Sequence, residues 1–374
     1  MSFPKLQHIH LERNVFSIVR LATFTECPHF LDYVNEEVAA LNFTVVIPSY
    51  DRPEVLCSKT LSLLRKHGVS DQNIMVLITP GRVPGNTESE WNRYRTCLLT
   101  NGYQDVRREI GALGLEKQIW QGMQFVGQGG YMICMTDDVS DIKMMRLLSR
   151  KMKAPKGPQV LTAGGLLGVF SLGWQLINDL QVGGWGVNCA HDGRSLHPRL
   201  VSRSLGLVEG NLYGIKVNLQ KEMQCQLSGV LCDHETSCRM WTHGDRFVRF
   251  QMLCVVHSYR SMGGYQSSCG VEKRKMLENK SIASLIKLFP DLVESRTPQK
   301  SAGSAFQRLQ YKKRRSPPIH MLPPTKGANL RKYTGLRGST SAERTAAWRK
   351  RAEKVKKRAL SVKKRPAAAP RSKV

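Results

Sequence analysis

The stretch that decides the fold reads Val45-Val46-Ile47-Pro48-Ser49-Tyr50-Asp51-Arg52-Pro53. Its first half, with the preceding Phe43 and Thr44, is a short β-branched run that ends at Pro48, and this predicts a buried strand over residues 43–47. Its second half is polar, so we expect a loop that places side chains at one end of that strand.

The chain on either side of the acidic pair Asp137-Asp138 alternates between helical and strand patterns. Apolar spacing and stop residues predict helices over residues 54–67, 89–99, 115–125, 236–242 and 281–290, and strands over residues 74–78, 106–110, 131–135 and 247–257. Strands separated by helices form parallel βαβ units. We therefore expect an α/β fold with a mostly parallel, Rossmann-like sheet flanked by helices. In such sheets, ligands bind beyond the carboxyl ends of the strands.

Asp137 and Asp138 directly follow the apolar strand expected over residues 131–135. They are therefore expected at the ligand-binding edge of the sheet, as is the polar loop that begins at Ser49. Carboxylate oxygens suit a hard divalent cation, which can in turn bridge a diphosphate. A nucleotide-sugar transferase needs such a cation to neutralise its leaving diphosphate. A solvated loop or a helix N-cap is the plainer interpretation of the same two residues.

Taken together, these segments resemble the GT-A glycosyltransferases. In that fold the nucleotide is cradled by the end of the first strand, which reads Pro, then Ser or Thr, then Tyr or Phe. An Asp-x-Asp motif follows a later strand. Here the counterparts are Pro48-Ser49-Tyr50 and Thr136-Asp137-Asp138. Residues 111–118, 233–237, 257–264 and 281–290 extend the resemblance, which is strongest to the TET-associated glycosyltransferases, a GT-A group linked to modified bases in DNA. The resemblance covers residues 42–293.

This resemblance implies roles for individual residues. The residues expected to bind the nucleotide-sugar donor, for which a UDP-sugar is favoured, are Pro48, Ser49, Tyr50, Arg52, Lys117 and Asp137. Asp138 and His257 are expected to hold the divalent metal, Mn²⁺ or Mg²⁺. The chain departs from the family pattern at Thr136, where the first acid of the motif would stand, and this leaves open a member that is inactive or binds metal weakly.

The second half of the chain is expected to build the acceptor side. An inverting transferase needs a carboxylate to take the proton of the attacking hydroxyl, and Asp233 and Glu235 are the two candidates. An alternative role for these acids is to cap the helix expected over residues 236–242.

Two further candidates lie in this half. A zinc site from Cys232, His234 and Cys238 is conceivable, but it lacks a second ligand pair at standard spacing. Trp185 is a candidate to stack on a sugar or base, although a core position is the interpretation that we favour.

Positive charge is concentrated at the end of the chain. Of 374 residues, 57 are Lys or Arg and 29 are Asp or Glu, and residues 300–374 alone hold 23 basic and 2 acidic ones. The composition predicts a largely disordered tail that binds nucleic acid and carries a nuclear import signal. No stretch is apolar and long enough to cross a membrane, and the first residues show no secretory signal pattern.

The sequence therefore predicts three parts: an N-terminal extension (residues 1–41), a GT-A-like domain (42–295) and a basic tail (296–374). The favoured function is a metal-dependent glycosyltransferase in the nucleus that modifies a hydroxyl acceptor, such as a hydroxymethylated base in DNA. A protein acceptor is a further possibility. The alternative from another class is an inactive GT-A scaffold that binds nucleic acid in the nucleus.

Overall fold

A computed structural model describes residues 41–79, 87–144, 158–188, 196, 202, 204–227, 231–257, 264–296 and 308–312. All of them belong to one compact unit, Met1–Ser316. The expected N-terminal extension, apart from Leu41, lies outside the described residues, and so does most of the expected disordered basic tail.

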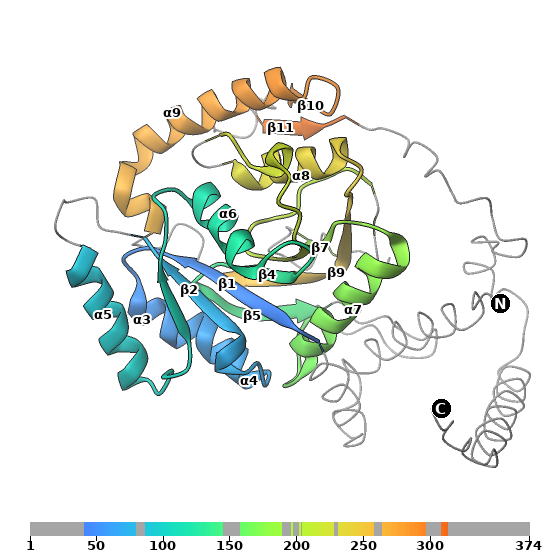
Figure 1. Cartoon of the computed structure of the whole chain (residues 1–374). Helices are drawn as coiled ribbons and strands as arrows, with labels where there is room; N and C mark the ends of the chain where they lie inside the picture. The colour runs from blue at the N-terminus through green and yellow to red at the C-terminus, as the bar shows by residue number, and fades with distance from the viewer. Residues whose placement is uncertain are drawn as a thin grey trace, which may run out of the picture. The chain divides into compact units, whose positions relative to one another are not determined.

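The elements alternate much as the sequence predicts (Figure 1). The strands are β1 (Phe43–Ser49), β2 (Ile74–Ile78), β3 (Arg107–Ile110), β4 (Tyr131–Met135), β5 (Val139–Met144), β6 (Gln159–Val160), β7 (Gly184–Asn188), β8 (Leu212–Lys216), β9 (Phe247–His257), β10 (Val293–Arg296) and β11 (Arg308–Tyr311). The α-helices are α3 (Pro53–Leu56), α4 (Ser62–Lys66), α5 (Thr87–Thr100), α6 (Leu115–Val126), α7 (Gly165–Leu180), α8 (Cys232–Thr242) and α9 (Gly264–Leu288). A π-helical turn, η1 (Cys57–Leu61), joins α3 to α4, and two 3₁₀ turns are η2 (Asp71–Asn73) and η4 (Lys221–Met223).

Within the described residues, nine strands form one sheet in the order β3-β2-β1-β4-β8-β7-β9-β5-β6. β1 pairs in parallel with both β2 and β4, and β2 pairs in parallel with β3. β8 and β5 run against their neighbours, while the other strands of the sheet share one direction. The expected α/β class with a mostly parallel sheet flanked by helices is therefore confirmed.

Helices cover both faces of this sheet (Figure 1). Val45 and Ile47 of β1 belong to a cluster that contains apolar residues of α3, α4, α5 and α7. Val46, which points the other way, packs in a second cluster with Met123 of α6 and Met240 of α8. Because both faces of β1 are buried, its sequence is a continuous apolar run and not an alternating one.

The sequence predicts that the first strand stops at Pro48, but β1 continues through Pro48 to Ser49. Pro48 pairs with Leu77 of β2, whereas the described pairing with β4 ends at Val46. Proline lacks an N–H group, so it is tolerated where one neighbouring strand has already ended. The outcome is a strand whose last residue, Ser49, is still held in the sheet.

Trp185 lies in the core, as favoured from the sequence. Its side chain is fully buried, its ring packs against Phe170 and Phe250, and its indole N–H donates to the hydroxyl of Tyr131 at 2.6 Å. A stacking contact with a sugar or base is therefore excluded for this residue.

The end of the described chain is part of the fold. β11 pairs antiparallel with β10, and Lys312 donates from its backbone N–H to the carbonyl of Leu292 at 2.8 Å. The ring of Tyr311 stacks on His234 of α8 and their polar atoms lie 2.9 Å apart. Residues 308–312, which the sequence analysis assigns to the tail, thus pack beside the first turn of α8.

In the part of the chain that the structure describes, no helix combines the length and the apolarity that crossing a bilayer requires.

Candidate active site

Strand directions bring the candidate residues to one edge of the sheet. β1, β4 and β9 end at this edge, at Ser49, Met135 and His257, while the antiparallel β5 and β8 begin there. Thr136, Asp137 and Asp138 form the turn between β4 and β5. The edge therefore gathers residues from five strands, and it is the edge at which α/β sheets bind ligands.

Asp137 joins the tip of β1 to the turn after β4. Its carboxylate accepts a hydrogen bond from Ser49 Oγ at 2.7 Å and one from Arg52 Nε at 3.2 Å, and a second nitrogen of Arg52 contacts its other oxygen. The residue is 1% exposed. Burial raises the pKa of Asp137 to about 6, although Arg52 and Ser49 act to lower it. The two segments singled out from the sequence therefore converge on one carboxylate.

Tyr94 of α5 completes this contact. Its hydroxyl lies 2.7 Å from Ser49 Oγ and accepts from the backbone N–H of Arg52 at 3.1 Å. Because Ser49 uses its single proton on Asp137, Tyr94 must donate to Ser49. Burial raises the pKa of Tyr94, so the phenol keeps the proton that this chain of hydrogen bonds needs. Sequence reasoning missed Tyr94, which stands in an ordinary helical pattern.

The π-helical turn η1 holds the turn that carries the two acids. Thr60 is fully buried; its Oγ1 donates to the carbonyl of Thr136 at 2.8 Å and accepts from the N–H of Val139 at 3.0 Å. π-Helical turns are rare and often mark functional sites. Thr60 thereby fixes the backbone of the turn that carries Asp137 and Asp138, a role with no sequence signal.

Asn211 links the acidic turn to His257. Its backbone carbonyl accepts from the N–H of Thr136 at 3.3 Å, and its side-chain oxygen accepts from Thr136 Oγ1 at 3.4 Å. Its side-chain nitrogen lies 3.2 Å from Nδ1 of His257. Thr136, the residue that departs from the family pattern, is thus a structural link between β4 and β8.

The two expected metal ligands come from neighbouring positions of the sheet. Val139, the residue after Asp138, pairs with His257 in the β5–β9 ladder. Among the described residues, no group of three or more His, Cys, Asp or Glu side chains could hold a metal ion. The zinc site considered for Cys232, His234 and Cys238 is therefore not formed. One carboxylate and one imidazole suit a metal that takes its other ligands from a diphosphate and from water. The residues present thus fit a metal shared with a bound donor.

The acids Asp233 and Glu235 have different surroundings, because α8 begins at Cys232 and not after them. Glu235 is fully buried and accepts from the backbone N–H groups of Gln226 and Leu227, both at 2.8 Å, and from Arg239 at 2.7 Å. Both oxygens of Glu235 are thereby committed to holding the loop before α8. These contacts favour a structural role for Glu235 over the expected role of catalytic base.

Asp233 remains as the candidate base, and a second acid accompanies it. Asp233 is partly exposed in the first turn of α8 and accepts from the N–H of His234 at 2.8 Å. A Cβ atom added to Gly210 would lie 3.9 Å from Cβ of Asp233, so the segment before β8 runs alongside. Ser237 ties the two segments, since it accepts from the N–H of Val208 at 3.0 Å and donates to the carbonyl of Asp233 at 2.8 Å.

Glu209 in this segment stands out in the sequence only as an acid before a strand. Burial, and next the negative charge of Asp233, raise the pKa of Glu209 to about 8, while a hydrogen bond with Asn211 lowers it. A buried acid with a strongly raised pKa is a candidate functional residue. Glu209 therefore joins Asp233 on the acceptor side of the site.

The remaining residues expected to bind the donor, Tyr50 and Lys117, are more exposed than Ser49 and Asp137. Tyr50 is partly exposed at the end of β1, and Lys117 is exposed in the first turn of α6. The next residue of that turn, Gln118, donates to Thr79 at 2.5 Å, and Thr79 donates from its backbone N–H to Ser49. Gln118 and Thr79 thus connect the first turn of α6 to the end of β1.

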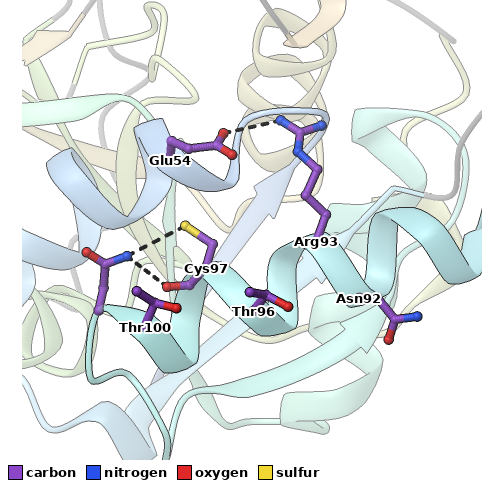
Figure 2. Close-up of a pocket in the computed structure, with 7 residues that line it drawn as sticks. Glu54, Asn92, Arg93, Thr96, Cys97 and Thr100 are labelled. Atoms are coloured by element: carbon purple, nitrogen blue, oxygen red, sulfur yellow. Dashed lines mark hydrogen bonds and ion pairs between the residues drawn. The ribbon is translucent and has the colours of Figure 1, made fainter.

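A shallow surface pocket lies elsewhere, between α3 and α5 (Figure 2). Its lining residues are Glu54, Asn92, Arg93, Thr96, Cys97, Thr100 and Asn101. Glu54 and Arg93 form an ion pair of 3.2 Å across its rim. None of the expected site residues lines this pocket, and we assign it no function.

No protein-family model matches the chain, and no curated protein matches its sequence. Solved structures that resemble it include the mannosyltransferase PcManGT from Pyrobaculum calidifontis in complex with GDP-Man and Mn²⁺, at 11% identity and a TM-score of 0.38, with 78% of this chain and 77% of that chain covered. S. aureus TarS 1-349 in complex with UDP-GlcNAc matches at 10% identity and a TM-score of 0.40, covering 66% and 67%. Glucosyl-3-phosphoglycerate synthase from Mycobacterium tuberculosis, in complex with Mn²⁺, UDP-Glc and phosphoglyceric acid, matches at 12% identity and a TM-score of 0.40, covering 71% and 87%. These likenesses are distant, so the function must be argued from the residues of the chain itself.

Glu209→Gln should change the pH dependence of stability. An acid with a raised pKa in the folded state stabilises the fold below its unfolded pKa, near 4.5, and loses that contribution as the pH rises through about 8. The free energy of unfolding of the wild type should therefore fall relative to the variant between these values, as measured by urea unfolding at several pH values. Asp233→Asn should make this fall smaller, because it removes a charge that raises the pKa of Glu209. Parallel pH profiles for the wild type and Glu209→Gln would contradict the assignment.

Proposed function

We propose that the protein is a metal-dependent glycosyltransferase of the GT-A type, which moves a sugar from a nucleotide-sugar donor to a hydroxyl acceptor. One observation carries the proposal: Ser49 and Arg52 at the tip of β1 both bond to Asp137 after β4, at the ligand-binding edge of the sheet. This contact brings together the two segments that a nucleotide diphosphate would need.

On the donor side, the tip of β1 supplies the nucleotide site. Ser49, Tyr50 and Arg52 would bind the nucleotide of a UDP-sugar, and Lys117 on the first turn of α6 would meet its phosphates. Pro48 shapes the backbone at this point, and Asp137 holds Ser49 and Arg52 in place. Asp138 and His257 would hold the metal, whose chemistry is to neutralise the charge that builds up on the leaving diphosphate. A mixed carboxylate and imidazole set favours Mn²⁺ over Mg²⁺.

On the acceptor side, Asp233 takes the proton of the acceptor hydroxyl. As the O–H bond breaks, the hydroxyl oxygen forms a bond to the anomeric carbon of the sugar, and the bond from that carbon to the diphosphate breaks. The electron pair of the broken bond leaves with the diphosphate. Glu209, held beside Asp233 by Asn211 and by the Ser237 link, keeps a proton near neutral pH because burial raises its pKa to about 8.

For the acceptor we propose nucleic acid, in particular a hydroxymethylated base in DNA, as in the TET-associated group that the sequence resembles. The charge of the chain supports this, because residues 317–374 hold 17 Lys or Arg and 2 Asp or Glu. Such a segment would bind phosphates, raise the local concentration of the acceptor and direct the protein to the nucleus. The alternative, an inactive scaffold that binds nucleic acid, is favoured by one observation: Thr136 stands where the first acid of the motif is expected.

Donor binding is tested by thermal unfolding. A UDP-sugar with Mn²⁺ should raise the melting temperature of the wild type, because a ligand that binds only the folded state stabilises it. Asp138→Asn should lose this joint stabilisation while its melting temperature without ligands stays close to that of the wild type. If no nucleotide sugar stabilises the wild type with Mn²⁺ present, the scaffold alternative is favoured.

The two acids of α8 should separate catalysis from stability. Asp233→Asn should lower the turnover number by about 10²- to 10⁴-fold, the usual contribution of a general base, with little change in the free energy of unfolding. Glu235→Gln should instead lower the urea midpoint, since its carboxylate is buried against Arg239 and two backbone N–H groups. Full turnover in Asp233→Asn would remove Asp233 from the reaction.

The tail is tested by truncation after Ser316, which leaves β11 in place. Binding of DNA should weaken, and the slope of log K against log salt should become less steep, because fewer counterions are released. A truncation that starts at residue 300 serves as the contrast: it also removes Tyr311 from His234, and so should lower the melting temperature. An unchanged salt slope after the shorter truncation would show that residues 317–374 do not contact phosphate.

A further inference from the structure

Arg52 contacts both acids of the turn after β4. Its guanidinium donates to Asp137 from two nitrogens and lies 3.6 Å from Oδ2 of Asp138 through the third. The side chains are nearly enclosed, with 15% of Arg52, 1% of Asp137 and 8% of Asp138 exposed. A cation supplied by the chain thus occupies the position between the two carboxylates.

The backbone holds Arg52 in this position. Asp51 adopts a left-handed conformation with φ of 54°, which turns the chain after β1. Asp tolerates this region better than most residues, and here its carboxylate accepts from Arg93 at 2.5 Å. The N–H of Arg52 donates to Tyr94, and α3 begins at the next residue, Pro53. The backbone of Arg52 is therefore fixed by the turn at Asp51 before it and by the helix that begins at Pro53 after it.

Two adjacent carboxylates that are withdrawn from water need a compensating cation. Arg52 forms ion pairs with both of them. Its hold on the two acids is unequal. Asp137 receives three hydrogen bonds from Ser49 and Arg52, whereas the ion pair between Arg52 and Asp138 is longer than a hydrogen bond.

We propose that Arg52 is the resident counter-cation of this acidic pair, and that a divalent metal binds by displacing the guanidinium from Asp138 while Asp137 retains it. The inference rests on the proposed function and adds a determinant of metal affinity to it. Asp138 is then the exchangeable ligand, and Asp137 is the anchor on which Arg52 stays within reach of the site.

Arg52 also couples the binding of metal to the binding of donor. With Arg52 in place, the acidic pair carries a single net negative charge, so a divalent cation alone is attracted weakly. A diphosphate adds negative charge beside Asp138 and offers Arg52 a new partner. Metal and donor should therefore bind cooperatively, each raising the affinity for the other by the same factor.

The test is a Mn²⁺ titration without donor, followed by electron paramagnetic resonance of free Mn²⁺. Arg52→Gln removes the competing cation, so its affinity for Mn²⁺ should exceed that of the wild type by at least about tenfold. Arg107→Gln is the matched control, because it removes an arginine of β3 that pairs with Glu109 and that forms no ion pair with the acidic pair. Its Mn²⁺ affinity should equal that of the wild type. Equal or weaker Mn²⁺ binding by Arg52→Gln would overturn the proposal.

Thermal unfolding provides a second readout. Without metal, Arg52→Gln should melt below the wild type, since it leaves two carboxylates uncompensated, and Mn²⁺ should raise its melting temperature more than it raises that of the wild type. The double variant with Asp138→Asn should lose this extra gain. If Arg52→Gln does not fold, the wild type supplies the test: UDP should raise its affinity for Mn²⁺, and equal Mn²⁺ affinity with and without bound UDP would overturn the proposal.

The outcomes also separate this inference from the proposed function. Equal Mn²⁺ affinity in the wild type and Arg52→Gln, with stabilisation by a UDP-sugar and Mn²⁺ intact, would overturn the inference alone. Failure of both proteins to bind Mn²⁺ or any nucleotide sugar would overturn the proposed function and the inference with it.

Discussion

The site is organised around one buried carboxylate. Asp137 is withdrawn from water, so its oxygens must find donors within the protein. Those donors are Ser49 and Arg52, which lie 88 and 85 residues away in the chain. The contact fixes the end of β1 against the turn after β4, and Tyr94 and Thr60 hold it from the helical side. β1 and β4 are already paired in the sheet, and this carboxylate adds the side-chain contact that fixes their ends to each other.

The acceptor side depends on the same turn. Thr136 bonds to Asn211, and Asn211 in turn contacts His257 and Glu209. From there Ser237 connects the segment before β8 to the first turn of α8, which carries Asp233. The β10–β11 hairpin then supports α8 through Tyr311. A set of polar contacts therefore runs from the donor edge to β11, the last described strand.

The sequence predicted those features that depend on local patterns. β2 and β4 are uninterrupted apolar runs, and their predicted and observed bounds agree. α7 is absent from the helices that the sequence predicts, because glycine lowers helix propensity. These glycines let the helix pack closely on the sheet, since a Cβ atom on Gly173 would clash with Trp185. β11 was missed because it lies in a basic stretch and is stabilised by pairing with β10.

The candidate base shows the limit of motif reading. Asp233 and Glu235 are two positions apart, and on a helix such residues point about 200° apart, so only one of them can face a given site. Both were candidates because the helix was expected to begin after them. Glu209 had no motif at all; its importance comes from burial beside Asp233, which only the packing of the segment before β8 against α8 creates.

The site contains buried acids and an unusual backbone conformation that lower the stability of the fold, and this argues for a function. Asp137 and Glu209 both have raised pKa values because burial disfavours their charged forms, and Asp51 holds a left-handed backbone. Apolar side chains of similar volume in place of buried ion pairs are often neutral or stabilising. A scaffold that bound nucleic acid only through its basic segment would have no use for such a cluster at the ligand edge of the sheet. Residues with strained backbone angles or strongly shifted pKa values cluster at functional sites in proteins. We therefore favour the enzyme over the scaffold, with Thr136 understood as the residue that ties the acidic turn to Asn211.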